Sequence, residues 1–240
     1  MLDWTTYAIA DFIPFDRQAA ERLYVIANAR LWPWHLLSAA LAGLLLSAFL
    51  VDSRRAWRAG LIALGGAWTM VAGGVLGREL ASLLWIGPQL AWASVAFAAV
   101  PIALAFSLGR DRASRRGPVA ALDAHSPRPF ADVSVPAGLL LLWAIVGHPS
   151  TAPLVADRPW AGVEWFGIAP APTAMATLAA AAVLPWRTAI LLTLGPLAWF
   201  LLAAAAALVL GQPDTTLSIV IAMLLFIVAV VRRATRRRAA

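Results

Sequence analysis

Cysteine and lysine are both absent from this 240-residue chain, and charged residues of any kind are scarce. Without cysteine the protein can form no disulfide, no thiolate metal site and no cysteine nucleophile. Only 13% of the residues are charged, against about 25% in an ordinary soluble domain. Because 62% of the residues are hydrophobic and the mean hydropathy is +0.79, composition alone predicts a membrane protein.

Ionisable residues are also missing from the centres of the apolar runs. Proton-coupled carriers usually need such a residue, so a proton-driven antiporter is disfavoured. The chain has no phosphate-binding glycine loop, zinc-protease motif or nucleophile elbow. His35 and His148 lie on separate segments without a metal-ligand spacing. The sequence therefore predicts no catalytic activity, no metal and no cofactor.

Long apolar runs are the main feature that is present. A transmembrane helix needs roughly 20 mostly apolar residues, and about 17 suffice. The sequence thus predicts an all-α bundle of seven transmembrane helices in one membrane domain, residues 34–231, between an N-terminal segment 1–33 and a basic tail 232–240. The predicted spans are residues 34–51, 59–76, 83–108, 130–147, 167–184, 186–210 and 217–231.

Arginines distinguish the two sides of the predicted bundle. Of the nineteen basic residues, fourteen follow the first, third, fifth or seventh span, where the positive-inside rule places the cytoplasm. We therefore expect a multi-pass membrane protein with its N-terminus outside and its C-terminus in the cytoplasm. The net charge of +7 then reflects anchoring beside the lipid bilayer and does not predict nucleic-acid binding. These arginines are Arg54, Arg55, Arg58, Arg110, Arg112, Arg115, Arg116, Arg128, Arg187, Arg232, Arg233, Arg236, Arg237 and Arg238.

The segment before the first span reads as an amphipathic helix. Asp16 can cap it, and the helix over residues 16–31 would lie on the outer membrane surface as an interfacial element. Its apolar face would consist of Leu23, Tyr24, Ile26, Ala27 and Leu31, and its polar face of Arg17, Glu21, Arg22 and Asn28.

Small residues and tryptophans predict contacts between the spans. Ala39 with Gly43, and Gly73 with Gly77, form small-xxx-small pairs that allow helices to approach closely. Trp68, Trp143 and Trp199 lie deep within the predicted spans. Since an indole N–H needs a hydrogen-bond acceptor when buried, we expect these three rings to face other helices.

The fifth span is unusually short, and it carries the candidate site. Pro172 fits only a first helical turn, so the regular helix would cover about 18 Å of a core about 30 Å thick. The preceding backbone must then enter the membrane under a cover of protein or water. The fourth span also ends early in this interpretation, at Gly147–His148–Pro149.

These two features predict an outward-facing depression between the fourth and fifth spans. The ligand-binding candidates are Gly167, Pro170, Pro172, Thr173 and His148. The helix start would direct free N–H groups at an anionic or carbonyl ligand. The alternative is structural: the prolines end a loop, and neighbouring helices cover the short helix.

Five stretches of the chain resemble a family of uncharacterised bacterial inner-membrane proteins that are loosely labelled permeases. The most distinctive is Gly167-Ile168-Ala169-Pro170-Ala171-Pro172-Thr173 with Thr177-Leu178, similar to that family's Gly-x-x-Pro-x-Pro-Thr signature; Ala171 and Ala179 stand where the family commonly has Cys and Gly. The others are Asp11-Phe12-Ile13-Pro14-Phe15, Asn28 with Leu31-Trp32-Pro33, Pro196-Leu197-Ala198-Trp199 and Leu210-Gly211-Gln212-Pro213-Asp214. The resemblance implies a membrane fold but no reaction.

Two classes of function follow from the sequence. In the first, the protein binds or passes a small solute at the site between the fourth and fifth spans. In the second, it is a non-catalytic accessory subunit that packs against other membrane protein subunits. The lipid bilayer is the one partner that both interpretations require.

Overall fold

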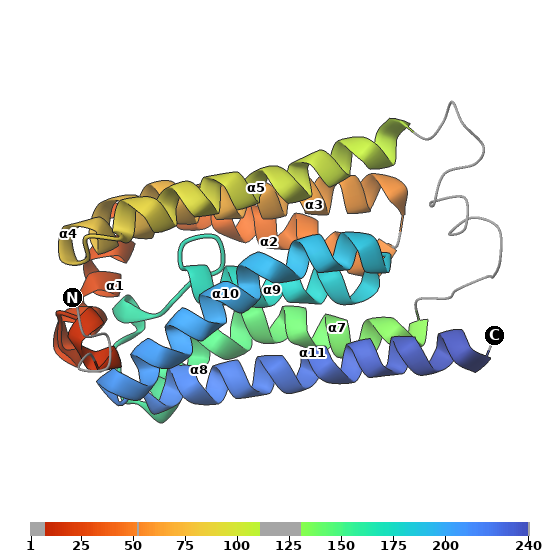
Figure 1. Ribbon diagram of the computed structural model, residues 1–240. Coiled ribbons are helices and arrows are strands. Elements are labelled where there is room, and N and C mark those ends of the chain that lie inside the picture. Colours follow the sequence, from red (N-terminus) through yellow and green to blue (C-terminus); the bar gives the residue numbers. More distant parts are fainter. Residues whose placement is uncertain (1–7, 52, 111–130, 240) are drawn as a thin grey trace, which may run out of the picture.

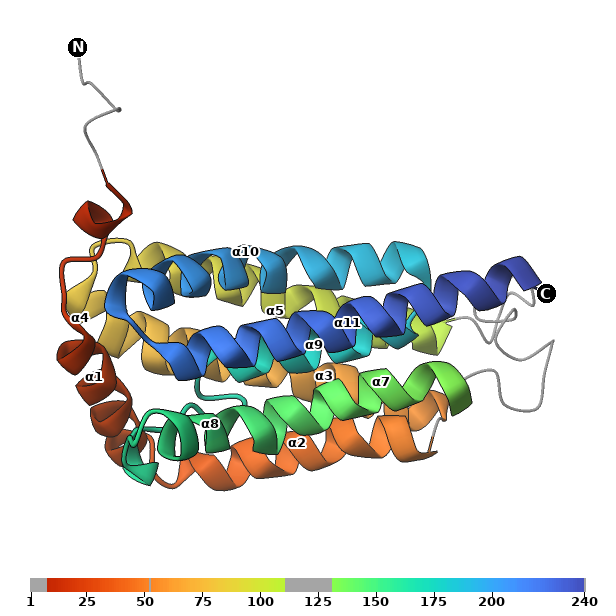
Figure 2. The ribbon, with the colours of Figure 1, turned by 90° about the horizontal axis from the view of Figure 1, so that it is seen from below.

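The computed structural model describes residues 8–51, 53–110 and 131–239, and this part of the chain is built of helices without any β-strand. Six helical stretches are long and apolar enough to cross a membrane. Figures 1 and 2 show them side by side as one elongated bundle. They are Trp34–Val51 (α2), Arg54–Leu83 (α3, a π-helical segment and α4), Gly87–Leu108 in α5 (Gly87–Arg110), Val135–Val155 (within α7 to α8), Trp186–Leu210 (α10) and Pro213–Thr235 in α11 (Pro213–Ala239).

Helix α1 (Arg17–Arg30) lies across the end of the bundle at which the chain begins, as Figure 2 shows. The predicted cap is present, because Asp16 Oδ1 accepts a hydrogen bond from the Ala19 N–H at 2.8 Å. Leu23 and Ala27 are buried, as the amphipathic pattern predicts, but Ile26 is exposed. The same pattern puts Asn28 on the polar face; it is buried instead and donates to the carbonyls of Ala161 and Val163.

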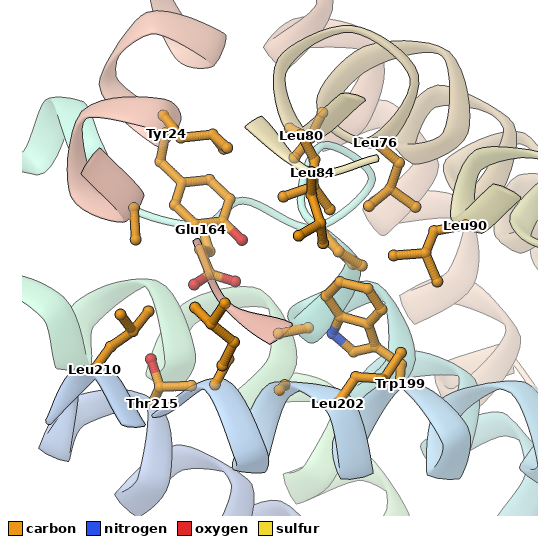
Figure 3. A pocket seen from close by; sticks show the side chains of 18 of the residues that line it. Tyr24, Leu76, Leu80, Leu84, Leu90, Glu164, Trp199, Leu202, Leu210 and Thr215 are labelled. Carbon is orange, nitrogen blue, oxygen red and sulfur yellow. The ribbon is translucent and has the colours of Figure 1, made fainter. Parts of the chain in front are cut away.

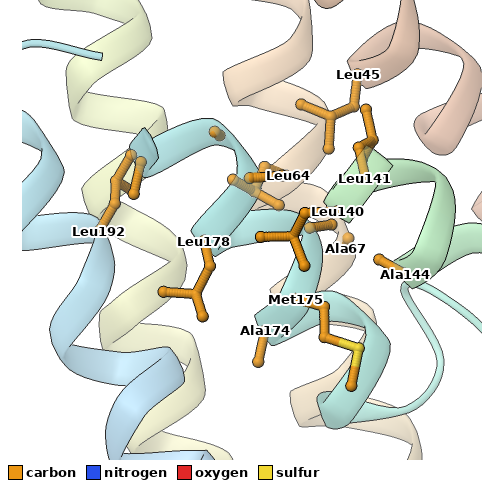
Figure 4. Packing of buried hydrophobic residues seen from close by; sticks show 14 of the residues in the cluster. Leu45, Leu64, Ala67, Leu140, Leu141, Ala144, Ala174, Met175, Leu178 and Leu192 are labelled. Carbon is orange, nitrogen blue, oxygen red and sulfur yellow. The ribbon is translucent and has the colours of Figure 1, made fainter. Parts of the chain in front are cut away.

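The fifth predicted span contains the short helix α9 (Pro170–Val183), which has 14 residues and so a length of about 21 Å. It lies at the centre of the bundle, and every one of its residues is buried. Figure 4 shows its Met175 and Leu178 among leucines of α2, α3, α7 and α10. Helix α9 is therefore shorter than a full span, and its polar backbone is covered by protein.

Two π-helical segments interrupt the long helices near the α1 end of the bundle. The first, Ala72–Leu80, continues α3 (Arg54–Val71) into the short α4 (Ala81–Leu83). The second, Trp143–Gly147, joins α7 (Ala131–Leu142) to α8 (His148–Val155). Such segments are rare, and they occur frequently at functional sites.

The second π segment corrects the predicted end of the fourth span. The helix does not stop at Gly147–His148–Pro149; it runs on to Val155. Pro149 lies in the first turn of α8, where its missing N–H breaks no necessary hydrogen bond. The wide π turn thus lets the chain accept a proline that would otherwise end the helix.

Ala39, Gly43 and Gly73 do not pack against another helix of the described chain. Ala39 is exposed, and a Cβ built on Gly43 or Gly73 would meet nothing within 4 Å. The buried face of α2 carries Ser38, Ala42, Leu45 and Ala48 instead.

Gly77 does lie at a helix contact, because a Cβ added to it would be 3.6 Å from the Ala91 Cβ of α5. That added Cβ would also come within 2.6 Å of the Ala72 carbonyl oxygen five residues earlier. The π backbone brings this carbonyl close, and so it requires glycine at this position.

Candidate functional site

A partly open cavity of about 240 Å³ lies at the α1 end of the bundle. Figure 3 shows side chains that line it. Its walls come from α1, the first π segment, the start of α5, the start of α9, and α10. Most of the lining is leucine, isoleucine and alanine, so the cavity is suited to an apolar occupant.

The cavity reaches the outer surface of the bundle along α10. Leu202 lines the cavity and is 46% exposed. Neighbouring Leu201 is 75% exposed, so this part of α10 presents an apolar outer face. In a protein whose long helices cross a membrane, such a face lies against lipid.

Glu164 is the charged side chain on the cavity wall within the described chain. It lies in the loop between α8 and α9 and is 7% exposed. Figure 3 shows the Tyr24 hydroxyl beside its carboxylate, and the two side chains are hydrogen-bonded. The cavity therefore has an apolar body with one acidic end.

Trp199 supplies an unused hydrogen-bond donor on the same cavity. The indole N–H of Trp68 donates to Thr177 Oγ1 at 2.9 Å, and that of Trp143 donates to Ser218 Oγ at 3.1 Å. Both meet the expectation that deep indoles find partners within the bundle. The Trp199 Nε1 atom is buried and has no partner, although its ring lines the cavity. A ligand with an acceptor group could satisfy this donor.

Glu164 belongs to a buried polar cluster that consists of Tyr24, His148, Arg158, Glu164, Asp214 and Ser218. His148 Nε2 lies 3.5 Å from Glu164 Oε2, and His148 Nδ1 lies 2.7 Å from Ser218 Oγ. Arg158 and Asp214 form an ion pair, with their side chains 6% and 1% exposed. Four separate segments of the chain therefore meet through charged or polar side chains at this end of the bundle.

The second π segment explains how Trp143 and His148 reach the same serine. The His148 backbone N–H bonds to the Trp143 carbonyl, five residues earlier. This wide turn brings residues five apart close together on one side of the helix. Trp143 donates to Ser218 Oγ, so the serine hydroxyl can donate to His148 Nδ1. That arrangement leaves the proton of a neutral His148 on Nε2, which faces Glu164.

Opposing influences act on the Glu164 carboxyl. Burial by itself raises its pKa, but the contact with His148, the positive charge of Arg158 and the hydrogen bond from Tyr24 outweigh burial. The pKa of Glu164 therefore lies below its ordinary value, and the side chain is a carboxylate at neutral pH. Burial, followed by the nearby Glu164 charge, raises the pKa of Tyr24 well above its usual value, so Tyr24 stays a hydrogen-bond donor.

The formal charge of the cluster is not balanced by its arginine. Arg158 contributes one positive charge, whereas Glu164 and Asp214 contribute two negative charges. Asp214 is paired with Arg158, and Glu164 lies beside Tyr24 and His148. Among the described residues, Glu164 is therefore the carboxylate that reaches the cavity wall without an arginine partner of its own.

The predicted site residues separate into two groups. Pro170 lines the cavity, while His148 lies behind Glu164 and belongs to the polar cluster. Gly167, Pro172 and Thr173 are buried. Thr173 Oγ1 accepts from the Gly167 N–H and donates to the Ala169 carbonyl, both at 2.8 Å. These hydrogen bonds connect the loop to the start of α9. They give Gly167 and Thr173 a structural role, which is the alternative to ligand binding for this segment.

The cavity also has a different position from the predicted depression. It lies between α9, α10, the first π segment and α1, and none of the described residues of α7 or α8 lines it. The loop that joins α8 to α9 turns inward and packs on α1 and α2 instead. The space expected between the fourth and fifth predicted spans is thereby filled by backbone.

Sequence reasoning did not identify Arg158, Glu164 or Asp214 as site residues. Each follows or precedes an apolar run, in a position typical of a solvated loop charge. One signal in the sequence could have identified them. The fifth span is too short to cross the membrane, so the backbone next to it must enter the bundle and can carry nearby charged residues inside. No group of three or more histidine, aspartate or glutamate side chains suited to a metal ion occurs among the residues that the structure describes.

Comparison with models of protein families, with curated proteins and with solved structures finds no match to this chain. Its function must therefore be inferred from the cavity and the polar cluster.

Proposed function

We propose that this membrane protein binds an elongated, lipid-like molecule in the cavity at the α1 end of the bundle. The observation that carries the proposal is an apolar cavity beside the exposed apolar side of α10, with a carboxylate on its wall. Such a site takes an amphiphile more readily than a free polar solute, because most of its lining cannot replace the hydration of a polar molecule.

The orientation predicted from the arginines gives the site a location in the cell. The chain enters α2 at the α1 end, and α11 ends at the opposite end (Figure 1). The positive-inside rule favours the cytoplasm for the end with Arg54, Arg55 and Arg233. We therefore propose that the cavity faces the outer leaflet of a bacterial inner membrane and that α1 lies on the outer surface.

Photolabelling with a diazirine-bearing hexadecanol in lipid nanodiscs tests this proposal. Label should attach to cavity-lining residues of α10 and of the first π segment, as mapped by peptide mass spectrometry. Ala203→Phe places a large ring into the cavity, so it should lower labelling of the first π segment roughly tenfold, equal to about 1.4 kcal/mol of binding.

Ala198→Phe is the matched control, because Ala198 lies on the same helix but is exposed and does not line the cavity. It should leave labelling of the first π segment unchanged. Equal labelling of that segment in wild type, Ala203→Phe and Ala198→Phe would show that the probe reports only general contact with lipid, and the proposed function would then fail.

A second candidate function is that of an accessory subunit, and one observation favours it. Ala39 and Gly43 are exposed on the outer side of α2, and small residues on an open helix face allow a helix of another protein to approach closely. Native mass spectrometry of protein extracted gently from its host tests this candidate. A stoichiometric protein partner that is lost in Gly43→Leu would support it, whereas a lone chain in both samples would exclude it.

A further inference from the structure

We infer that the ligand of this cavity carries a positively charged, hydrogen-bond-donating head, a protonated amine, that pairs with Glu164. The inference rests on the proposed function and adds the chemistry of the polar end. It depends on three features: the position of the Glu164 carboxylate on the cavity wall, its remaining acceptor positions, and the free donor of Trp199.

Charge excludes one class of head group. Glu164 is 7% exposed and lies on the cavity wall, and the ion pair of Arg158 is formed with Asp214 and not with Glu164. A carboxylate or phosphate head placed against Glu164 would bring two negative charges together in a poorly solvated site. A cationic head instead pairs with the carboxylate on the cavity wall.

The Glu164 carboxylate also retains hydrogen-bonding capacity. A carboxylate offers about four acceptor positions, and the described polar groups beside it are the Tyr24 hydroxyl and His148 Nε2, which is 3.5 Å from Oε2. These two groups cannot fill all of the acceptor positions, so some stay available to a ligand. An ammonium group supplies the donors that match them.

Trp199 adds a second point of recognition. Its buried indole N–H lacks an acceptor and borders the same cavity as Glu164 (Figure 3). An ester, amide or hydroxyl oxygen near the amine would remove the cost of this unsatisfied donor. The preferred ligand is therefore an apolar chain that carries an amine and a neighbouring neutral acceptor.

Competition against the hexadecanol photolabel tests the head group. The competitors are dodecylamine, dodecanol and dodecanoate, which share a twelve-carbon chain and differ in charge at pH 7. In wild type, the half-displacement concentration should rise from the amine to the alcohol to the carboxylate, with about a tenfold difference or more between the amine and the carboxylate.

Glu164→Gln removes the charge while keeping a side chain that can bond to Tyr24 and His148. Each competitor partitions equally into nanodiscs that hold wild type and nanodiscs that hold Glu164→Gln. A change between these two proteins in the ratio of the half-displacement concentrations of amine and carboxylate therefore reports binding at the site. In Glu164→Gln, the half-displacement concentrations of the amine and the carboxylate should differ by no more than about twofold. Trp199→Phe should weaken the binding of dodecanol but leave the amine-to-carboxylate ratio unchanged.

The outcomes separate the two claims. Cavity labelling that all three competitors displace equally, or an unchanged ratio in Glu164→Gln, would overturn the amine assignment while leaving lipid binding intact. Absence of cavity labelling in wild type would overturn the proposed function itself. If Glu164→Gln does not fold, the order of the three competitors in wild type still tests the inference. Dodecanoate that binds wild type as tightly as dodecylamine would contradict it.

Discussion

The buried ion pair between Arg158 and Asp214 offers a direct test of the polar cluster. Both side chains are more than nine-tenths buried. Removing one partner of a buried pair leaves an unpaired charge and typically costs about 3–5 kcal/mol, whereas replacing both partners is often nearly neutral. We therefore expect Arg158→Met and Asp214→Asn each to lower the free energy of unfolding by more than the double variant does.

The two single variants should not be equally destabilising. Arg158 also lowers the pKa of Glu164, so its positive charge acts on both carboxylates. Arg158→Met leaves two negative charges without an arginine, while Asp214→Asn leaves Arg158 to compensate Glu164. The loss should therefore be near the upper end of about 3–5 kcal/mol for Arg158→Met and smaller for Asp214→Asn.

Reversible unfolding in mixed dodecylmaltoside and dodecylsulfate micelles, followed by circular dichroism, measures these free energies. The control pair is Arg17 and Glu21, which are four residues apart on α1 and 41% and 28% exposed. Arg17→Met and Glu21→Gln should each cost no more than about 0.5 kcal/mol. The reasoning would be refuted if the double variant lost as much free energy of unfolding as the sum of the two single variants. It would also be refuted if the single variants at Arg158 and Asp214 lost no more than the control variants.

Three further predictions address the loop, the carboxylate and the orientation. Gly167 has a φ of +72°, which strains any residue with a Cβ, whereas the nearest atom to an added Cβ, Ser38 Oγ, is 3.4 Å away and leaves room for it. Gly167→Ala should therefore lower the free energy of unfolding by about 1–2 kcal/mol through backbone strain alone. A much larger loss in the same unfolding assay would indicate a steric clash instead. Glu164 stabilises the fold above about pH 4.5 because its pKa is lowered in the folded protein, and this contribution disappears as the pH falls through that lowered pKa. Thermal unfolding from pH 7 to pH 3 should thus show the advantage of wild type over Glu164→Gln vanish at the acid end, and a constant difference would contradict the assignment. A reporter that is active only in the periplasm should stay silent when it is fused after Ala240, and a strong signal would reverse the proposed orientation.

The long helices were predictable because a bilayer imposes one requirement on all of them. Each needs a run of apolar residues, and six such runs correspond to long apolar helices in the structure. Hydropathy locates the ends of these helices less well. Helix α11 begins at Pro213 and not near Leu217, because a helix's first turn accepts proline and polar residues that hydropathy counts against a span.

The π segments were not predictable from residue types. Pro149 and the glycine before it read as the end of a helix, since a proline normally removes a backbone hydrogen bond. The structure accommodates this proline with a wide turn that also places Trp143 and His148 on Ser218. The role of this turn becomes visible only from the contact of Trp143 and His148 with Ser218 of α11. Hydropathy along a single segment contains no information about such a contact.

The short α9 connects the structural and functional parts of the molecule. Because it is about 21 Å long, the loop before it must enter the bundle, and that loop's backbone needs hydrogen-bond partners away from water. Asn28, Ser38 and Thr173 supply them. The prolines at the first and third positions of α9 help as well, because they lack two N–H groups that a buried helix start would leave unsatisfied.

The same inward loop carries Glu164 to the cavity wall. A full-length fifth span would have kept this residue in the outer loop, where a charge is solvated. Because α9 starts deep, Glu164 is buried and must be held by Tyr24, His148 and Arg158. The proline signature therefore determines the site indirectly: Pro172 and Thr173 build the buried start of the helix, and that start places Glu164 where a ligand can meet it.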